Sequence, residues 1–210
     1  LKLDCGQTIN NFPLAYETYG SLNEKKDNAI LVFHALTGDQ FVSGVNPITN
    51  KDGWWSYAVG SGKALDTDKY FVICANVISG CLGSFGPSNI NPKTNKIYGT
   101  DFPIITINDM VNAQYNLLDF FKIEKLFAVM GGSMGGMQVL QFVSNFPDKA
   151  KIAIPIACTS SHSAQNIAFN ELGRQSIMAD TNWLNGDYAN QNKNPDKGLS
   201  VARMAAHITY

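Results

Sequence analysis

The sequence predicts an α/β fold in which a mostly parallel sheet carries helices on both faces. Two observations support this prediction. Short apolar runs, bounded by turn or polar residues, alternate along the chain with longer amphipathic runs. The composition, 45% hydrophobic and 16% charged, is that of an ordinary globular domain. Strands that alternate with helices favour parallel pairing, because a crossover helix separates one strand from the next.

The predicted strands are the short apolar runs at residues 29–33, 70–76, 126–130 and 151–157. The earlier stretch at residues 14–19 has alternating character, which is typical of an antiparallel edge strand.

Two helices are predicted between and after these strands. Residues 108–121 place their apolar side chains on one helical face, and Thr106 and Asp109 form a capping-box pattern at the start. Residues 137–146 form the second helix, which Pro147 terminates.

The character of the chain changes after residue 157. Residues 164–178 and 199–210 are predicted to be helical, the polar tract 185–197 between them is predicted to be a loop, and no further strand follows. We therefore expect residues 1–160 to form an α/β core whose last strands are missing. Residues 161–210 are expected to begin a helical lid.

Charge and cysteine spacing exclude several classes of function. A formal net charge of −1 gives no reason to expect a nucleic-acid partner or an anionic membrane. Apolar runs are too short to span a bilayer, and no charged-then-apolar signal segment opens the chain. The four cysteines form no pair or cluster with zinc-ligand spacing, so no metal site is predicted.

The strongest chemical signal is the run GGSMGG at residues 131–136, which contains G-x-S-x-G between a predicted strand and a predicted helix. This context is that of the nucleophile elbow of the α/β-hydrolase fold, with Ser133 as the nucleophile. A sharp turn strains Ser133, so Gly131 and Gly135 must lack a Cβ to avoid the strand and the helix. The alternatives, a Gly-Ser turn without chemistry or a phosphate-binding loop, are less favoured, since neither GxGxxG nor a P-loop lysine is present.

An acyl-transfer serine also needs two backbone N–H donors for the oxyanion. The residue after the nucleophile, Met134, is the first candidate. The second is Leu36, in the loop that follows the strand at 29–33. His34, in the same loop, is expected to brace it rather than to act as the base.

The fold also requires an acid and a histidine that follow later strands, in the order Ser, Asp or Glu, His. After Ser133 only His162 and His207 remain, and both precede the expected positions. We expect the chain to be a fragment that ends within the lid, with its catalytic Asp and His beyond Tyr210.

Several blocks of the sequence resemble the homoserine O-acetyltransferase family: HALTGD at 34–39, GWW at 53–55, DTDKYF at 66–71, GCLGSFGP at 80–87, INP at 90–92, DMV at 109–111, GGSMGGM at 131–137 and ARMAAHITY at 202–210. The resemblance implies transfer of an acetyl group from acetyl-CoA to the hydroxyl of L-homoserine, through an acyl-Ser133 intermediate, in methionine biosynthesis. It implies acetyl-CoA as co-substrate and no cofactor. It also implies a cytoplasmic homodimer whose lid helices form the contact.

The resemblance further assigns Arg203 to the binding of homoserine. In a helix over residues 199–210, Arg203, His207 and Tyr210 fall at i, i+4 and i+7, so they share one polar stripe, and Tyr210 is a second candidate for substrate contact. A guanidinium can hold an amino-acid carboxylate with two hydrogen bonds.

Alternatives of two other kinds stay open. Related enzymes use a succinyl donor or acylate serine, and a serine ester hydrolase of the same fold would share Ser133 and the oxyanion loop. A non-catalytic α/β scaffold would not need a serine flanked by the glycines of the elbow.

Overall fold

The computed structural model describes residues 1–209, so the prediction for Tyr210 lies outside the described residues. The chain forms two compact units. Unit 1 comprises Leu1–Phe85 and Ile104–Ser160, and unit 2 comprises Gly86–Pro103 and the chain from Ser161 onward. The second boundary falls between residues 160 and 161. Gly86–Pro103, which lies within the stretch 1–160 of the sequence analysis, is part of unit 2.

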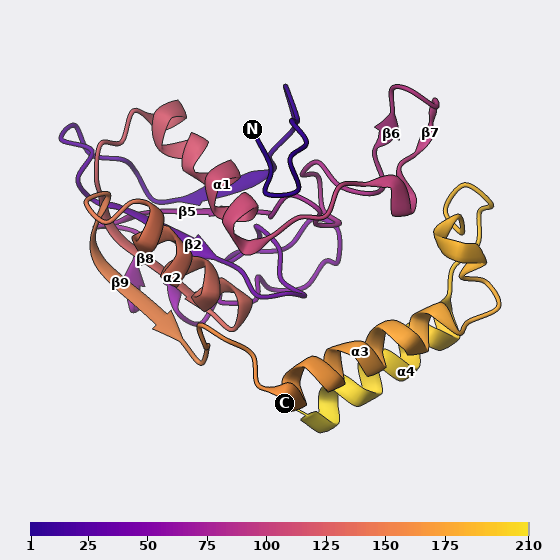
Figure 1. Cartoon of the computed structure of the whole chain (residues 1–210). Helices are drawn as coiled ribbons and strands as arrows, with labels where there is room; N and C mark the ends of the chain where they lie inside the picture. Colours follow the sequence, from indigo (N-terminus) through magenta and orange to yellow (C-terminus); the bar gives the residue numbers. More distant parts are fainter. Residues whose placement is uncertain (210) are drawn as a thin grey trace. The chain divides into compact units, whose positions relative to one another are not determined.

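Unit 1 is built on a five-stranded sheet with the order β1-β5-β2-β8-β9 (Figure 1). The strands are β1 (Tyr16–Tyr19), β2 (Ala29–Phe33), β5 (Phe71–Ala75), β8 (Leu126–Gly132) and β9 (Ala150–Ile156). β1 pairs antiparallel with β5, whereas β2, β5, β8 and β9 are parallel. The mostly parallel sheet with an antiparallel edge strand is therefore confirmed.

Every side chain of β2 and β5 is buried, which explains why these strands are continuous apolar runs rather than alternating ones. Two-residue ladders complete the strand inventory of the described residues: β3 (Val59–Gly60) with β4 (Leu65–Asp66), and β6 (Ile90–Asn91) with β7 (Lys96–Ile97).

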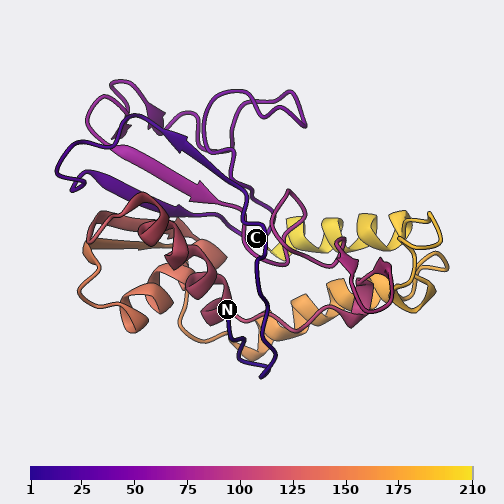
Figure 2. The ribbon, with the colours of Figure 1, turned by 90° about the horizontal axis from the view of Figure 1, so that it is seen from above.

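Helices α1 (Ile107–Phe121) and α2 (Met134–Asn145) pack on the same face of this sheet (Figures 1 and 2). A shared core joins side chains of the sheet to Val111 and Leu118 of α1 and to Val139 and Phe142 of α2. The predicted capping box is present: the Thr106 hydroxyl accepts from the Asp109 N–H, and the Asp109 carboxylate accepts from the Thr106 N–H.

Within unit 1, the opposite face of the sheet carries no helix. It is covered by the chain between β2 and β5, which contributes Val42, Trp54, Trp55, Val59 and Leu65. Within unit 1, the expectation of helices on both faces is therefore met on one face. On the other face, large apolar side chains from loops and from the short strands β3 and β4 cover the sheet, and their spacing carries no helical period that a sequence pattern could reveal.

Unit 2 contains the two predicted lid helices, α3 (Ala164–Met178) and α4 (Asp196–Thr209), side by side (Figure 1). Gly198 allows them to meet, because a Cβ there would lie 2.5 Å from the Ser176 carbonyl oxygen. The Asp180 carboxylate accepts a hydrogen bond of 2.8 Å from the Gly198 N–H and so caps the start of α4. Unit 2 also contains the short 3₁₀-helices η1 (Gly99–Asp101) and η2 (Leu184–Gly186).

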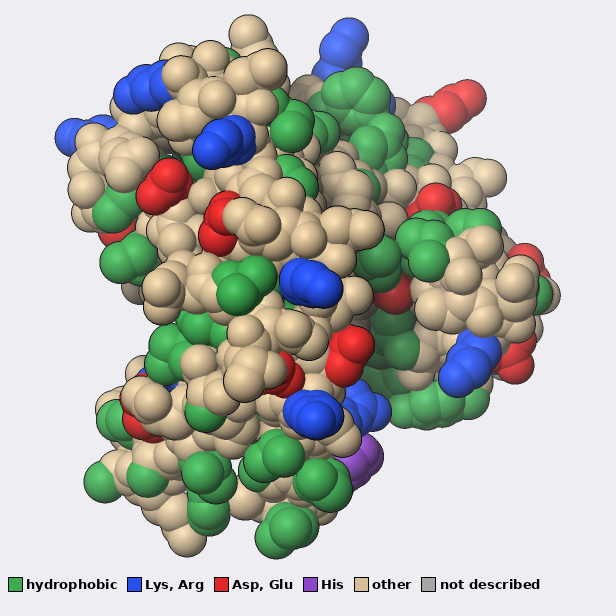
Figure 3. Space-filling model, turned by 90° about the vertical axis from the view of Figure 1, so that its right-hand side faces the viewer, with side chains coloured by type: hydrophobic (Ala, Val, Ile, Leu, Met, Phe, Trp, Pro, Cys, Tyr) green, Lys and Arg blue, Asp and Glu red, His purple; other side chains and the backbone are tan. Residues whose placement is uncertain are grey.

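Hydrophobic side chains, drawn in green, gather at several places on the face shown in Figure 3. On α3 and α4 the exposed large apolar residues are Ile167, Phe169, Leu172, Met178, Leu199, Val201, Met204 and Ile208. Within residues 1–209, none of the helices is long and apolar enough to cross a bilayer.

Candidate active site

Ser133 lies at the tip of a sharp turn between β8 and α2. Its backbone has φ 55° and ψ −119°, a conformation that side-chain-bearing residues rarely adopt. Two hydrogen bonds hold it there. Its N–H donates to the Ile156 carbonyl at the end of β9 (3.0 Å), and its carbonyl accepts from the Met137 N–H (3.1 Å). The turn therefore presents the Ser133 side chain beyond the carboxyl ends of the parallel strands.

The glycines of the motif are required by close backbone packing. A Cβ on Gly135 would lie 2.8 Å from the Phe33 carbonyl carbon and still closer to its oxygen. A Cβ on Gly131 would lie 2.6 Å from that same oxygen. Gly132, the variable position of the motif, has no atom near its missing Cβ. The first turn of α2 thus rests directly on the end of β2.

The loop after β2 leaves the sheet beside this turn. Phe33 and Gly131 are register partners in the parallel β2–β8 pair, and Leu36 and Met134 each lie three residues farther along. The chain goes from β2 to β5 on one side and then to β8 on the other, so this is the point where the strand order reverses. In open parallel sheets, ligands bind outside the carboxyl ends of the strands at such a point.

His34 fixes the course of this loop. Its side chain is 1% exposed; Nδ1 lies 2.7 Å from the Ala35 carbonyl oxygen, and Nε2 accepts a 3.0 Å hydrogen bond from the Val77 N–H. The ring is therefore neutral with its proton on Nδ1. Burial lowers the pKa of His34 below its usual range.

The contact of His34 with Ala35 has a consequence for Leu36. The Ala35 carbonyl accepts from His34 Nδ1 and from the Gly38 N–H (2.9 Å). A trans peptide points its C=O and N–H in opposite directions, so holding this carbonyl also sets the direction of the Leu36 N–H. In the described part of the chain the Leu36 N–H donates no hydrogen bond, and the Leu36 side chain is exposed.

Met134 occupies the first position of α2, where an N–H has no partner inside the helix. The Ser133 side chain does not cap this helix end. The N–H groups of the first turn and the helix dipole therefore favour negative charge beside Ser133. The Leu36 and Met134 amides both remain predicted oxyanion donors.

Unit 1 contains no histidine other than His34, and both nitrogens of its ring are already engaged. His162 and His207 both lie in unit 2 and are exposed. The predicted bracing role of His34 is thus confirmed by its contacts. Ser133 remains the predicted nucleophile, and no histidine of unit 1 has a free ring nitrogen to serve it as a base.

On α4, Arg203 is exposed and its Nε donates to Nε2 of His207 (3.1 Å). The two side chains share a helix face, as the i, i+4 spacing predicts. This contact leaves the terminal nitrogens of Arg203 available for a carboxylate.

Sequence reasoning missed two residues that hold the site together, Val77 and Gln138. Val77 acts through its backbone N–H, which leaves no trace in the sequence. Gln138 is a fully buried polar residue on α2, and its position among apolar neighbours was a signal that could have been read.

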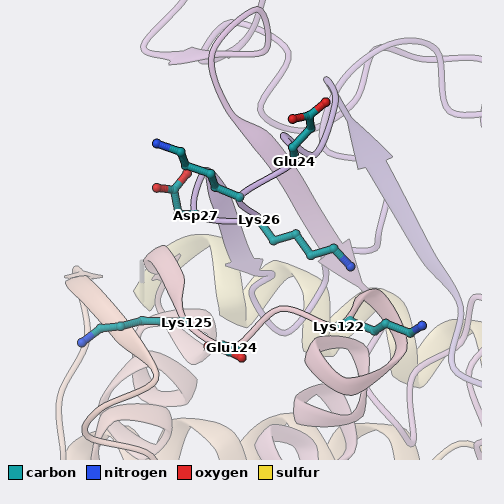
Figure 4. A pocket seen from close by; sticks show the side chains of 7 residues that line it. Glu24, Lys26, Asp27, Lys122, Glu124 and Lys125 are labelled. Carbon is teal, nitrogen blue, oxygen red and sulfur yellow. The ribbon is translucent and has the colours of Figure 1, made fainter.

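A surface pocket lies at the other end of the parallel strands (Figure 4). It is lined by the segments that precede β2 and β8: Glu24, Lys25, Lys26, Asp27, Lys122, Glu124 and Lys125. This pocket is distinct from the Ser133 site, because it lies at the amino ends of the strands, whereas Ser133 follows the carboxyl end of β8.

Comparison with known proteins matches residues 28–210 to the alpha/beta hydrolase fold family. The chain is 87% identical over all 210 residues to homoserine O-acetyltransferase of Pelagibacter ubique, of which it covers 56%. The crystal structure of homoserine O-acetyltransferase from Bacillus anthracis is similar, with a TM-score of 0.92 and 31% identity over 99% of this chain and 57% of that one. The esterase E22 L374D mutant has a TM-score of 0.90 and 34% identity over 98% of this chain and 57% of that one. The chain spans about half the length of the curated relatives it matches.

Gly135→Ala should destabilise the protein by about 1–3 kcal/mol, because the added methyl would overlap the Phe33 carbonyl and push α2 away from β2. Gly132→Ala is the matched control, with no atom near the new methyl, and should change stability by less than about 1 kcal/mol. Urea unfolding of both variants measures the difference. Equal stability of the two variants would contradict the close approach.

His34 should make the protein less stable in mild acid. The pKa of His34 is lowered in the folded protein, so the unfolded chain takes up the proton first as the pH falls. The contribution of neutral His34 to the free energy of unfolding is therefore present above about pH 6.5 and is lost as the pH falls below that value. The free energy of unfolding should fall by up to about 1.4 kcal/mol per pH unit from this group. Urea unfolding between pH 8 and pH 5 measures how the free energy of unfolding changes with pH, and this change should be smaller for His34→Gln than for the wild type. His162→Gln, at an exposed position, is the control. An unchanged pH dependence in His34→Gln would refute the role of His34 in acid destabilisation.

Proposed function

The chain belongs to the alpha/beta hydrolase fold family, and on that premise we propose that the whole protein is a homoserine O-acetyltransferase that works through an acyl-Ser133 intermediate. The observation that carries the proposal is the strained Ser133 turn, beside a braced loop and the start of a helix. The 87% identity to the Pelagibacter ubique enzyme supports the choice of reaction.

In the proposed reaction, Ser133 Oγ attacks the thioester carbonyl of acetyl-CoA and gives up its proton to a base. The tetrahedral oxyanion accepts hydrogen bonds from the Leu36 and Met134 N–H groups. Collapse expels the CoA thiol, which takes the proton back, and leaves acetyl-Ser133. The homoserine hydroxyl then gives its proton to the base and attacks the acetyl carbonyl, which forms a second oxyanion. The bond from the acetyl carbon to Ser133 Oγ breaks, Oγ takes the proton from the base, and O-acetylhomoserine leaves.

A base and its orienting acid are needed for both steps, and the ring of His34 is unavailable. We assign the catalytic His and Asp to the part of the relatives' length that this chain does not span. Acetyl-CoA is a co-substrate in this scheme and no cofactor takes part.

Arg203 is proposed to bind the carboxylate of homoserine, because its terminal nitrogens remain available when Nε contacts His207. Tyr210 stays a candidate for substrate contact on the sequence prediction alone. The exposed apolar side chains of α3 and α4 support a homodimer through the lid helices. A cytoplasmic location is proposed together with this role in methionine biosynthesis.

The second candidate is a serine ester hydrolase, in which water replaces homoserine in the second half of the reaction. Similarity to the esterase E22 variant, at 34% identity, favours this alternative. Succinyl-CoA as donor or serine as acceptor would keep the same Ser133 chemistry.

Incubation of the full-length protein with acetyl-CoA and homoserine tests the proposal. We expect CoA release to depend on homoserine and to yield O-acetylhomoserine, and Ser133→Ala to lower this rate on the order of 10⁴-fold or more. The alanine variant should unfold at a similar urea concentration to the wild type. Release of acetate without acyl transfer would favour the hydrolase, and an active Ser133→Ala variant would exclude Ser133 as nucleophile.

Arg203→Ala should raise the KM for homoserine by about tenfold to a hundredfold and leave the KM for acetyl-CoA nearly unchanged, because only the amino-acid carboxylate loses its partner. Arg174→Ala is a suitable control, since Arg174 is paired with Glu171 on α3. Equal effects on both substrates, or equal effects of the two variants, would remove Arg203 from the binding site.

A further inference from the structure

Gln138 connects the two backbone segments that flank Ser133. Its side chain is fully buried on α2. Nε2 lies 3.3 Å from the carbonyl oxygen of His34, in the loop after β2, and 3.4 Å from that of Met134, at the start of α2. Oε1 accepts a 2.7 Å hydrogen bond from Nε2 of Gln114 on α1.

Chemistry fixes which way this carboxamide points. Two backbone carbonyls face one end of the Gln138 amide, and carbonyls only accept, so the NH₂ group must lie there. Its oxygen then faces Gln114, which must present its own NH₂ group. Gln114 Oε1 remains buried without a hydrogen-bond partner among the described residues.

The bond to His34 acts on the peptide next to the one that carries the Leu36 N–H. Gln138 holds the His34 carbonyl, and the His34 ring holds the Ala35 carbonyl. Two consecutive peptides of the loop are thus fixed. Gln138 of α2 holds the peptide between His34 and Ala35, and the His34 ring holds the peptide between Ala35 and Leu36. The same carboxamide also contacts the Met134 carbonyl, so both segments with a predicted oxyanion donor share one anchor.

We propose that Gln138 is a positioning residue that sets the distance between the Leu36 and Met134 N–H groups, and thereby the stabilisation of the oxyanion that forms at Ser133. This inference rests on the proposed function, since it deepens the role of the same site. Gln138 does not touch the substrate and acts only through the two backbone segments.

The test is Gln138→Met, which keeps the length of the side chain and removes its N–H donors. The first reaction measured is acylation of Ser133 by p-nitrophenyl acetate, which needs the oxyanion donors and no homoserine. The second is steady-state acetyl transfer, with rates expressed per active site titrated by a fluorophosphonate. Val139→Ala, a buried change one residue along α2, is the control for a general loss of core packing.

We expect Gln138→Met to lower the acylation rate and kcat by about tenfold to a hundredfold, with KM values within about threefold of the wild type. Val139→Ala should lose stability and keep its acylation rate. If Gln138→Met does not fold, Gln138→Leu replaces it, because its apolar side chain has a similar size and no donor for the two carbonyls; the same loss is expected.

Acylation within twofold of the wild type, or equal losses in the Gln138 and Val139 variants, would overturn the positioning role and leave the proposed function intact. A wild-type protein that forms no acyl-Ser133 would overturn the proposed function and this inference together.

Discussion

The close approach between the end of β2 and the first turn of α2 is the constraint on which the site depends. There is no room for a Cβ on Gly131 or Gly135 next to the Phe33 carbonyl. Because the backbones meet without side chains between them, the start of α2 and the loop after β2 emerge side by side. In the proposed function, a wider separation would prevent the predicted donors, the Leu36 and Met134 N–H groups, from reaching the same oxyanion, whatever the sequence of the loop.

The strain at Ser133 follows from the same packing. A non-glycine residue at this φ and ψ costs about 1–3 kcal/mol and persists only where its surroundings determine it. Here β9 holds the Ser133 N–H and the first turn of α2 holds its carbonyl. Farther along α2, Val139 and Phe142 are fully buried against the sheet. The core therefore supplies the stability that keeps the turn, and the serine is oriented before any substrate binds.

Features with a local signal could be predicted from the sequence. The continuous apolar runs indicated the parallel strands, and the glycine spacing around Ser133 indicated the turn. The start of α2 was placed three residues late, at Met137 instead of Met134, because two glycines in the first turn conceal a helix that packing enforces. The start of α4 was also predicted late, at residue 199 instead of Asp196, because a glycine at 198 weakens the helical pattern. In the structure Gly198 lies where α3 approaches α4.

Features that depend on contacts between distant segments could not be predicted in this way. The chain between β2 and β5 buries a sheet face through scattered large side chains such as Trp54 and Val59. Gly86–Pro103 belongs to unit 2, where Asn190, far along the chain, bonds the backbone of Ile97. The role of His34 depends on the Val77 N–H, which only the fold brings near.

The arrangement of unit 1 does not by itself distinguish acyl transfer from ester hydrolysis. The backbone is similar both to an acetyltransferase and to an esterase variant, with TM-scores of 0.92 and 0.90. In the proposed function, the strained serine, the helix start and the braced loop would stabilise an oxyanion whether the acyl group goes to water or to an alcohol. Acceptor selection must therefore come from groups that recognise the acceptor itself. In the proposed function that group is Arg203, which belongs to unit 2. Changes at the elbow should then alter the rates with both acceptors together, whereas changes on α4 should alter the ratio between them.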